Sequence, residues 1–194
     1  MSDRSLDAAY FEGIFASDDD PWQLASSAYE RAKFDQTIAA LGDRRYRRTI
    51  EIGCAHGVLT AQLLALCDTL IAIDISTAAI AKARSRLGPK PGLTLAHMAF
   101  PREVPPATGF DLAVLSEVAY YWSDQDLERA AHWIEAHVAS GGYILLVHYT
   151  GETDYPQSGD GAVGFLKDAL GQAVTEEQRS ERHDRYRLDL WRRR

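Results

Sequence analysis

A glycine turn between two apolar runs carries the residues best suited to hold a nucleoside. Residues 49–57 read T-I-E-I-G-C-A-H-G, so Glu51, Gly53 and Gly57 are spaced as in a buried strand that enters a tight turn and opens a helix. The next apolar run, L-I-A-I-D, ends on Asp74, whose carboxylate could accept hydrogen bonds from both hydroxyls of a ribose. The pattern predicts the nucleoside half of a cofactor site.

The rest of the turn distinguishes between nucleotide cofactors. A dinucleotide site typically reads G-x-G-x-x-G, but here Cys54 and Ala55 replace the middle glycine. The chain also lacks G-x-x-x-x-G-K-[ST], so a triphosphate loop is not indicated. A glycine turn of an ordinary α/β domain, with Asp74 as a plain strand-end acid, stays open as the alternative at this point.

Histidines and cysteines do not form a metal-binding pattern. His132 and His137 are too widely spaced on a predicted helix to share a face, and no Cys/His/Asp cluster has ligand spacing, so we expect no metal. His56 lies inside the glycine turn. His148 differs because it ends an apolar run beside Tyr149, where it either lines an acceptor site or is a satisfied strand-end residue.

Hydrophobic periodicity predicts strands that alternate with helices. Such alternation implies right-handed crossovers and therefore an α/β fold, a Rossmann-like, doubly wound, mostly parallel sheet with an antiparallel C-terminal strand. The final strand, Tyr186 to Trp191, alternates with period two and is expected to be half-exposed. The predicted strands span 48–53, 70–74, 93–98, 110–116, 143–148 and 186–191. The first predicted helix spans 26–41, with Ser26 or Ser27 as its cap and Gly42 at its end, and the second runs from Val58 to about Leu66. The third is capped by Ser76 and ended by Gly88-Pro89. The last two span 124–139, ended by Gly141-Gly142, and 159–170.

Length and composition suit one compact enzyme-sized domain spanning residues 1–194. Its parts would be an N-terminal lid and helix (1–41), a cofactor-binding core (46–150), and a C-terminal helix with terminal strands (151–194). At 194 residues and 46% hydrophobic, the chain can bury a real core. A formal charge of -7 gives no general attraction to nucleic acid or anionic lipid. Two cysteines, no membrane-length apolar run and no signal-peptide pattern predict a cytoplasmic protein.

The order of motifs resembles the class I S-adenosylmethionine (SAM) methyltransferases over nearly the whole chain. The Glu51-x-Gly53-x-x-x-Gly57 turn is similar to their motif I. Two further stretches, Asp20-Pro21-Trp22 with Tyr29-Glu30-Arg31 and Ser116-Glu117-Val118-Ala119-Tyr120-Tyr121, resemble the nodulation N-methyltransferase (NodS) group. That family methylates the free amine of a deacetylated glucosamine on a chitin-type oligosaccharide. Residues 149–161 depart from the nodulation enzymes, which puts that one substrate in doubt.

The resemblance implies a set of cofactor contacts for SAM and its product, S-adenosylhomocysteine (SAH). Asp74 would hold the ribose and Ile75 would pack on the adenine, while Met98 and Ala99 replace an acid that many relatives place near the adenine amine. Trp22, whose alternative is a core aromatic, and Arg31 would lie over the cofactor, with residues 10–31 closing as a lid. The full set is Trp22, Arg31, Glu51, Gly53, Cys54, Ala55, Gly57, Asp74, Ile75, Met98, Ala99 and Ser116.

Methyl transfer asks mainly for alignment of the acceptor, plus a group to take a proton. The predicted ends of the fourth and fifth strands gather a pool of such groups, and we expect Glu117, His148 and Tyr120 to be catalytic, with Tyr121 and Tyr149 beside them. The expected acceptor is an amine or hydroxyl of a small polar molecule or carbohydrate. A small-molecule O-methyltransferase and a non-catalytic SAM-binding protein are the alternatives, and the chain would be a monomer or homodimer.

Overall fold

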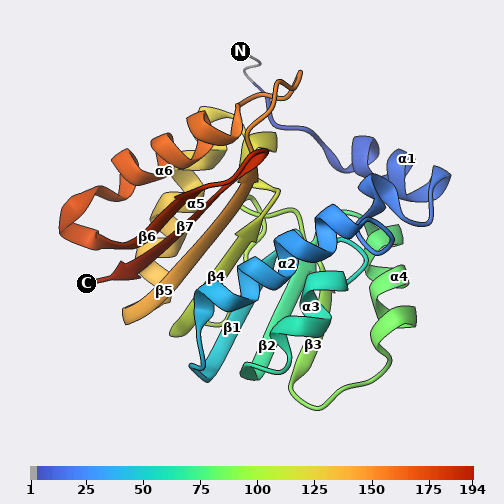
Figure 1. Cartoon of the computed structure of the whole chain (residues 1–194), viewed down its shortest axis with the longest axis horizontal. Helices are drawn as coiled ribbons and strands as arrows, with labels where there is room; N and C mark the ends of the chain where they lie inside the picture. The colour runs from blue at the N-terminus through green and yellow to red at the C-terminus, as the bar shows by residue number, and fades with distance from the viewer. Residues whose placement is uncertain (1–3) are drawn as a thin grey trace. The chain divides into compact units, whose positions relative to one another are not determined.

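The computed structural model describes residues 4–194, and the chain forms two compact units. One unit is Asp7–Ala99; the other is Phe100–Arg194 together with residues 4–6. The strand order is β3-β2-β1-β4-β5-β7-β6. Strands β1 to β3 are added toward one edge of the sheet and β4 and later strands toward the other, as in a doubly wound sheet. Figure 1 labels the helices and strands of both units.

In the first unit, β2 lies between β1 and β3, and all three strands are parallel. Its residues Leu70, Ala72 and Ile73 have no exposed surface, as expected for a strand covered on both faces. Helix α1 contacts α4, and α4 contacts β2 and β3. The elements are α1 (Ala8–Ser17), η1 (Pro21–Gln23), α2 (Ala28–Leu41), β1 (Tyr46–Ile52), α3 (Val58–Leu63), β2 (Cys67–Asp74), α4 (Thr77–Leu87) and β3 (Leu93–His97).

Capping residues in the sequence predicted the ends of α2 and α4, whereas α3 and α1 differ from the prediction. Ser27 caps α2 and Ser76 caps α4, as predicted, and Gly42 and Gly88 end them. Helix α3 is shorter than expected because it ends at Leu63, before Leu66. Helix α1 was not predicted at all, since its sequence A-A-Y-F-E-G-I-F-A-S has no clean apolar stripe, although its two phenylalanines are buried.

In the second unit, β4 and β5 are parallel and β7 is antiparallel to both β5 and β6. Helices α5 and α6 pack against each other, and α6 also contacts η2 and strands β5, β6 and β7. The elements are β4 (Phe110–Ser116), η2 (Ala119–Tyr121), α5 (Asp124–His137), β5 (Val138–Tyr149), α6 (Gly159–Val174), β6 (Thr175–Arg182) and β7 (Tyr186–Arg193).

The boundary between α5 and β5 corrects the sequence prediction. The helix was expected to continue to Ala139 and end at Gly141-Gly142, but it ends at His137 and both glycines lie inside β5. The register explains the difference, because Phe110 pairs with Val138 while Leu112 pairs with Tyr143, leaving extra residues in β5. Gly141, at φ 81°, permits this bulge, so the glycines bend a strand instead of stopping a helix.

The C-terminal hairpin also differs from the expectation. The strand predicted to be half-exposed, β7, is buried between β5 and β6, with Leu188 at 0% and Trp191 at 1% exposure. Strand β6, T-E-E-Q-R-S-E-R, was not predicted because its side chains are charged and mostly exposed. It forms the polar edge of the sheet.

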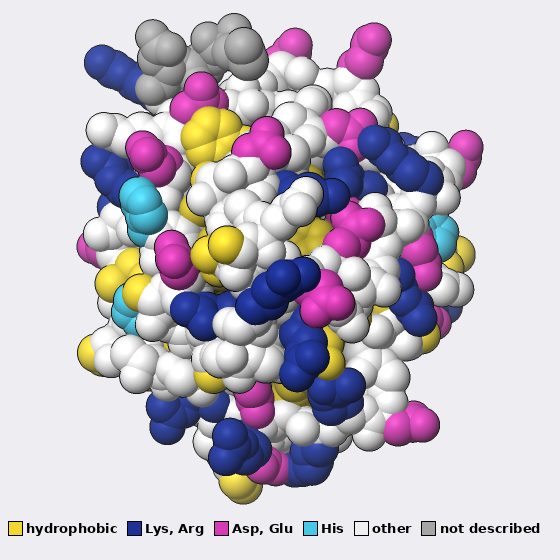
Figure 2. Space-filling view, turned by 90° about the vertical axis from the view of Figure 1, so that its left-hand side faces the viewer, with side chains coloured by type: hydrophobic (Ala, Val, Ile, Leu, Met, Phe, Trp, Pro, Cys, Tyr) yellow, Lys and Arg dark blue, Asp and Glu magenta, His cyan; other side chains and the backbone are white. Residues whose placement is uncertain are grey.

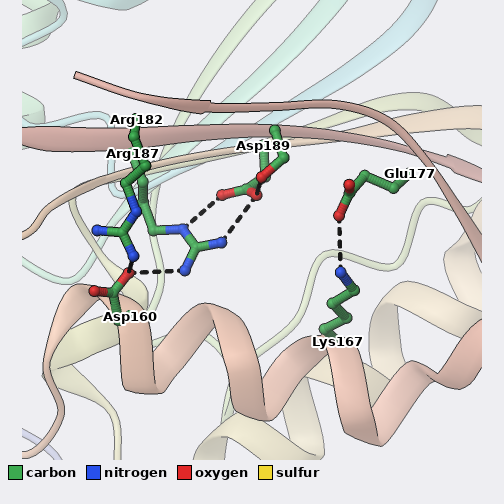
Figure 3. A network of polar contacts seen from close by, with 7 residues as sticks. Asp160, Lys167, Glu177, Arg182, Arg187 and Asp189 are labelled. Atoms are coloured by element: carbon green, nitrogen blue, oxygen red, sulfur yellow. Dashed lines mark hydrogen bonds and ion pairs between the residues drawn. The ribbon is translucent and has the colours of Figure 1, made fainter.

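Ion pairs fasten this hairpin to α6, as Figure 3 shows. Arg187 of β7 forms a bidentate pair with the buried Asp189 (2.7 and 2.9 Å) and also reaches Asp160 of α6 (2.8 Å), which Arg182 of β6 contacts as well. The partners raise the pKa of Arg187, and the two arginines lower the pKa of Asp160 against the effect of its burial. The bidentate pair within β7 orients the Arg187 guanidinium. The contacts to Asp160, with the Lys167–Glu177 pair, attach the hairpin to α6.

On the face that Figure 2 shows, lysines and arginines are interleaved with acids, and apolar side chains lie scattered among them. Within residues 4–194, no helix is both long enough and apolar enough to cross a membrane.

Candidate functional site

The cofactor loop, defined as residues 51–57, connects β1 to α3 and is pinned to the end of β2. The amides of Gly53 and Cys54 both donate to the carbonyl of Ile73, at 2.8 and 3.0 Å. Gly57 begins α3 at φ 82°, and a Cβ there would lie 3.1 Å from Leu87 Cδ1 of α4. Glycine is therefore required at position 57 both for the left-handed backbone and for close helix packing.

Asp74 ends β2 beside this loop, as predicted. Its Oδ2 accepts the amide of Ala55 (2.8 Å) and its Oδ1 accepts the amide of Ser76 (2.9 Å). Burial raises the pKa of Asp74 to about 6, although the two amides oppose that rise. Each carboxylate oxygen can accept a second hydrogen bond, so the side chain can hold the loop and still receive two ligand hydroxyls.

Glu51 is a buried acid without a cationic partner. Its side chain is 2% exposed, and its Oε2 accepts only the hydroxyl of Thr60 from α3, at 2.6 Å. Burial raises the pKa of Glu51 to about 8, and the charge of Asp74 adds to the rise. Throughout the described chain, Glu51 forms no ion pair with a lysine, arginine or histidine. Such a site favours a ligand that brings positive charge.

The N-terminal segment of this unit is attached to the loop and to α4. The Asp20 carboxylate accepts the amides of Ala25 (2.9 Å) and Ser26 (3.0 Å), and one of its oxygens lies 3.1 Å from His56 Nε2 inside the loop. Burial, reinforced by the charge of Arg86, lowers the pKa of His56 below its usual value, so near neutral pH the imidazole is largely uncharged. The contact is then polar, and it links the segment to the loop.

Trp22 follows Asp20 and does not behave as a core residue. Its side chain is 42% exposed, and its backbone is left-handed at φ 58°. Its ring meets Phe15 edge-on, with 5.7 Å between centroids. The core alternative is therefore wrong, and an exposed aromatic in a strained backbone is a candidate ligand contact.

Glu12 of α1 forms a second attachment, one that sequence reasoning missed. Its carboxylate accepts the hydroxyl of Ser76 (3.1 Å), the amide of Ala78 (3.2 Å), and both the amide and hydroxyl of Thr77. These bonds, led by that from the Thr77 hydroxyl, lower the pKa of Glu12 although burial opposes them. A carboxylate at a helix N-terminus is favourable, so α1 is anchored one turn from Asp74.

The remaining expected cofactor residues of this unit lie at or near the same strand ends, with one exception. Ile75, Met98 and Ala99 are half-buried, the amide of Met98 donates to the carbonyl of Asp74 (2.9 Å), and His97 Nε2 lies 3.0 Å from the carbonyl of Ile75. The exception is Arg31, which lies exposed on α2. Cys54 is buried, and burial raises the pKa of its thiol.

In the second unit, Glu117 follows β4 in a left-handed backbone at φ 57°, which is unusual for a non-glycine residue. Its Oε2 accepts the hydroxyl of Tyr120 (2.7 Å) and the amide of Tyr149 (2.8 Å). Ser116, just before it, is half-buried. The carboxylate is thus fixed at the ends of β4 and β5, in the position expected for a group that takes a proton.

Tyr120, Tyr121 and Tyr155 form the aromatic cluster beside Glu117. Tyr120 stacks on Tyr155 at 5.3 Å, and Tyr121 meets Tyr155 and Tyr120 edge-on at 4.7 and 4.6 Å. Burial raises the pKa of Tyr120 and of Tyr121, so both phenols stay protonated. Tyr155 was not predicted, because only the folded loop brings D-Y-P onto η2.

His148 lies inside the protein near the end of β5. The imidazole is fully buried, and its Nε2 accepts the amide of Ala119 at 3.1 Å. A nitrogen engaged in this way cannot take a proton from an acceptor while the bond persists. Through this bond Nε2 holds η2, which carries the tyrosines, and the catalytic role expected of His148 stays a prediction.

An open pocket lies on the loop that follows β5. It is lined by Thr150, Gly151, Glu152, Thr153, Asp154 and Ser158. Its two acids give it negative charge. No group of three or more His, Cys, Asp or Glu side chains within residues 4–194 is arranged to hold a metal ion.

The strand order, the glycine turn after β1 and the acid that ends β2 define the class I methyltransferase fold. Comparison with known proteins identifies the family: the model of Nodulation protein S (NodS) matches residues 15–145, so the chain belongs to the NodS family. Nodulation protein S of Sinorhizobium fredii is 30% identical over 129 residues, which are 66% of this chain and 59% of that protein. The matches span between 51% and 59% of the curated relatives' length, so this chain corresponds to little more than half of them.

Solved structures agree with this assignment. The N-methyltransferase NodS of Bradyrhizobium japonicum WM9, solved in complex with SAH, superposes with a TM-score of 0.82 over 96% of this chain and 97% of that one, at 22% identity. A Pseudomonas syringae protein provisionally called a methyltransferase is 34% identical, with a TM-score of 0.72 over 86% of this chain and all (100%) of that one. The predicted fold class and family are thereby confirmed.

Proposed function

We propose that the chain transfers the methyl group of SAM to the amine of a polar, sugar-like acceptor. Membership of the NodS family supports the reaction class, and the cofactor loop supports the choice of cofactor. The observation that carries the proposal is the buried pair of acids, Glu51 and Asp74, at either side of the glycine turn.

These acids argue for SAM and against a dinucleotide. A pyrophosphate would bring negative charge beside Glu51, which is 2% exposed and has no cationic partner in the described chain, and would oppose its ionisation, whereas a cationic ligand favours it. When bound, SAM supplies a methyl group activated by its sulfonium charge, so the protein needs to position the acceptor and manage a proton. The Asp74 carboxylate suits a ribose diol, and Ile75 offers a half-buried apolar face at the same strand end.

The second unit supports an amine as acceptor. Glu117 is a carboxylate held by two donors, and it can take the proton that the amine must lose. Tyr155, the half-buried member of the aromatic cluster, is a ring on which the apolar side of a sugar could stack. Glu152 and Asp154 on the neighbouring loop favour a cationic acceptor over a phosphorylated one. An amino sugar or a partly deacetylated oligosaccharide meets these requirements.

The test is SAH release from SAM with glucosamine, deacetylated chitin oligosaccharides and their N-acetylated counterparts. Deacetylated acceptors should give a methylated amine by mass spectrometry, and acetylated ones should not. Glu117→Gln should lower turnover by roughly 10² to 10⁴, since it keeps the acceptor of the Tyr120 bond but not the base. Methylation of a hydroxyl alone would replace the proposal with an O-methyltransferase, and SAM binding without turnover on any acceptor would indicate a binding protein.

A further inference from the structure

Glu51 is the most unusual titratable group of the first unit, because burial and its surroundings both oppose its charge. The proposed function uses Glu51 as a buried acid that favours a cationic cofactor and gives it no part in releasing the product. The groups that face it are known: Thr60 of α3 donates a neutral hydrogen bond, and the thiol of Cys54 and the carboxyl of Asp74 are its acidic neighbours. None of these groups supplies a positive charge.

Asp74 does not relieve this situation. Both of its oxygens already accept backbone amides, and the charges that act on it are Glu12 of α1, which disfavours its ionisation, and His97 of β3, which favours it. With a pKa of about 6, Asp74 is mostly ionised near neutral pH, whereas Glu51 with a pKa of about 8 is mostly protonated. The ligand-free loop thus holds one carboxylate and one carboxylic acid, the second of which can ionise when a cation arrives.

We propose that Glu51 is the residue by which the loop distinguishes charged SAM from neutral SAH: it gives up its proton when SAM binds and keeps it when SAH binds. The inference rests on the proposed function and concerns the charge of the ligand. SAM carries one more positive charge than SAH, and a positive charge brought into a water-poor site stabilises a neighbouring carboxylate. The proton of Glu51 leaves to solvent on SAM binding, and one proton returns once the sulfonium charge has been lost.

The consequence for turnover is a difference between substrate and product. Above neutral pH, ionised Glu51 favours the ligand with the extra positive charge, so the ratio of the SAH to the SAM dissociation constant rises with pH. After methyl transfer the sulfonium charge is absent, so it no longer stabilises the ionised form of Glu51 beside the product. This disfavours retention of SAH and eases exchange for SAM.

The experiment is isothermal titration calorimetry of SAM and of SAH, between about pH 6.5 and 8.5, in phosphate and in Tris buffer. Below about pH 8, wild-type protein should release close to one proton on binding SAM and clearly less on binding SAH, and the release with SAM should decrease above that pH. Its SAM affinity should rise by up to about tenfold per pH unit below pH 8 and then level off. Glu51→Gln should bind SAM as wild type does at the acid end, release no proton, and fall behind as pH rises.

Two further variants control the result. Thr60→Val removes the bond that lowers the pKa of Glu51, so its pH dependence should move to higher pH. Asp68→Asn removes an exposed acid at the far end of β2 and should behave as wild type. The titrating groups of the ligand itself are common to all variants, so differences between them isolate Glu51.

Outcomes separate this inference from the proposed function. If SAM and SAH do not bind at all, the proposed cofactor is wrong. If both bind but wild type and Glu51→Gln show parallel pH profiles, or if SAH releases as many protons as SAM, the role of Glu51 is overturned while the cofactor assignment stands. Far-ultraviolet circular dichroism and thermal unfolding of each variant confirm that a changed profile does not reflect lost folding.

Discussion

At the scale of single residues, Asp74 has two tasks that are difficult to separate. Its oxygens hold the amides of Ala55 and Ser76, and thereby the shape of the cofactor loop and the first turn of α4. The same oxygens are proposed to receive the ribose hydroxyls. A substitution that removes the side chain therefore disturbs the loop and the ligand contact together, whereas one that keeps its shape disturbs them unequally.

Asp74→Ala should weaken SAH binding by roughly 2 to 4 kcal/mol, since it removes charge-assisted hydrogen bonds that water replaces only in part. Asp74→Asn keeps one carbonyl acceptor and should lose less. Calorimetric titration of both variants provides the comparison, with Asp68→Asn of the same strand as control. Equal affinities in wild type and Asp74→Ala would show that Asp74 serves the backbone alone.

The residues of the candidate site that could be predicted are those recognised by their spacing within a short stretch of sequence. The spacing of Glu51, Gly53 and Gly57 and the strand-end acid Asp74 can be recognised along the chain because one turn contains them. Glu12 and Tyr155 could not be recognised, because each acquires its role through a partner far away in sequence. The burial of His148 and its bond to the Ala119 amide could not be predicted for a related reason, since both depend on residues distant in sequence.

At the scale of elements, α1 buries two phenylalanines and is bonded to the first turn of α4. The Glu12 carboxylate accepts four hydrogen bonds there. Polar contacts at Glu12 and Asp20 attach the segment to α4 and to the cofactor loop, and such contacts can break and re-form while the strands stay intact. This supports the proposal that residues 10–31 act as a lid.

Glu12→Ala should loosen this segment and leave the strands intact, because it removes the anchor without touching the core. Limited proteolysis between residues 8 and 26 should become faster than in wild type, and added SAH should slow the cleavage of wild type more than that of the variant. Asp7→Ala, which removes only the cap of α1, is the matched control. Identical cleavage with and without ligand in wild type would argue against a lid.

Two glycines of α6 test how the start of this helix packs against the end of β5. A methyl group at Gly159 would overlap the carbonyl oxygen of Tyr149, whereas one at Gly164 meets nothing within 4 Å. Gly159→Ala should therefore destabilise the protein and displace Tyr149, while Gly164→Ala should stabilise it by up to about 1 kcal/mol through helix propensity. Chemical denaturation measures both, and equal effects would contradict the packing described for Gly159.

Helices and strands with clear capping residues or a regular apolar pattern could be predicted from the sequence, and those that depend on packing against distant elements could not. Strand β4 was predicted with its observed bounds and α4 with its cap. Helix α1 and strand β6 escaped notice because their sequences lack a regular apolar pattern: α1 buries only two phenylalanines, and β6 is an exposed edge. The end of α5 was predicted too late for a third reason. Glycine occurs both after helices and at strand bulges, so Gly141-Gly142 alone does not distinguish the two.

At the scale of the whole molecule, two groups of acids have opposite effects on stability as pH changes. Glu12, Asp20, Asp126 and Asp160 have lowered pKa values, so their contribution is present above their unfolded pKa and is lost on acidification. Glu51 and Asp74 have raised pKa values, about 8 and about 6, so the folded state binds more protons than the unfolded state between about pH 4 and pH 8. Stability therefore falls as pH rises through that window.

The ligand-free protein should accordingly be most stable near about pH 5 and lose stability toward pH 8. Glu51→Gln should flatten the decline between about pH 6 and 8, because its neutral side chain has no proton to lose. Urea denaturation midpoints at several pH values give the curve. A variant that declines as steeply as wild type would show that Glu51 does not ionise in this range.

The polar edge formed by β6 bears on how the protein can be handled. Every other residue of an edge strand presents unpaired backbone groups, which can recruit a second chain into a continuous intermolecular sheet. Here the acids and arginines of T-E-E-Q-R-S-E-R occupy that position, while the apolar strands β5 and β7 lie inside. A truncation that removed the hairpin would uncover Ile144, Leu145, Leu146 and Val147, and the purified fragment would be prone to fibrillar aggregation. Expression work should therefore retain residues 175–194 and attach affinity tags beyond them.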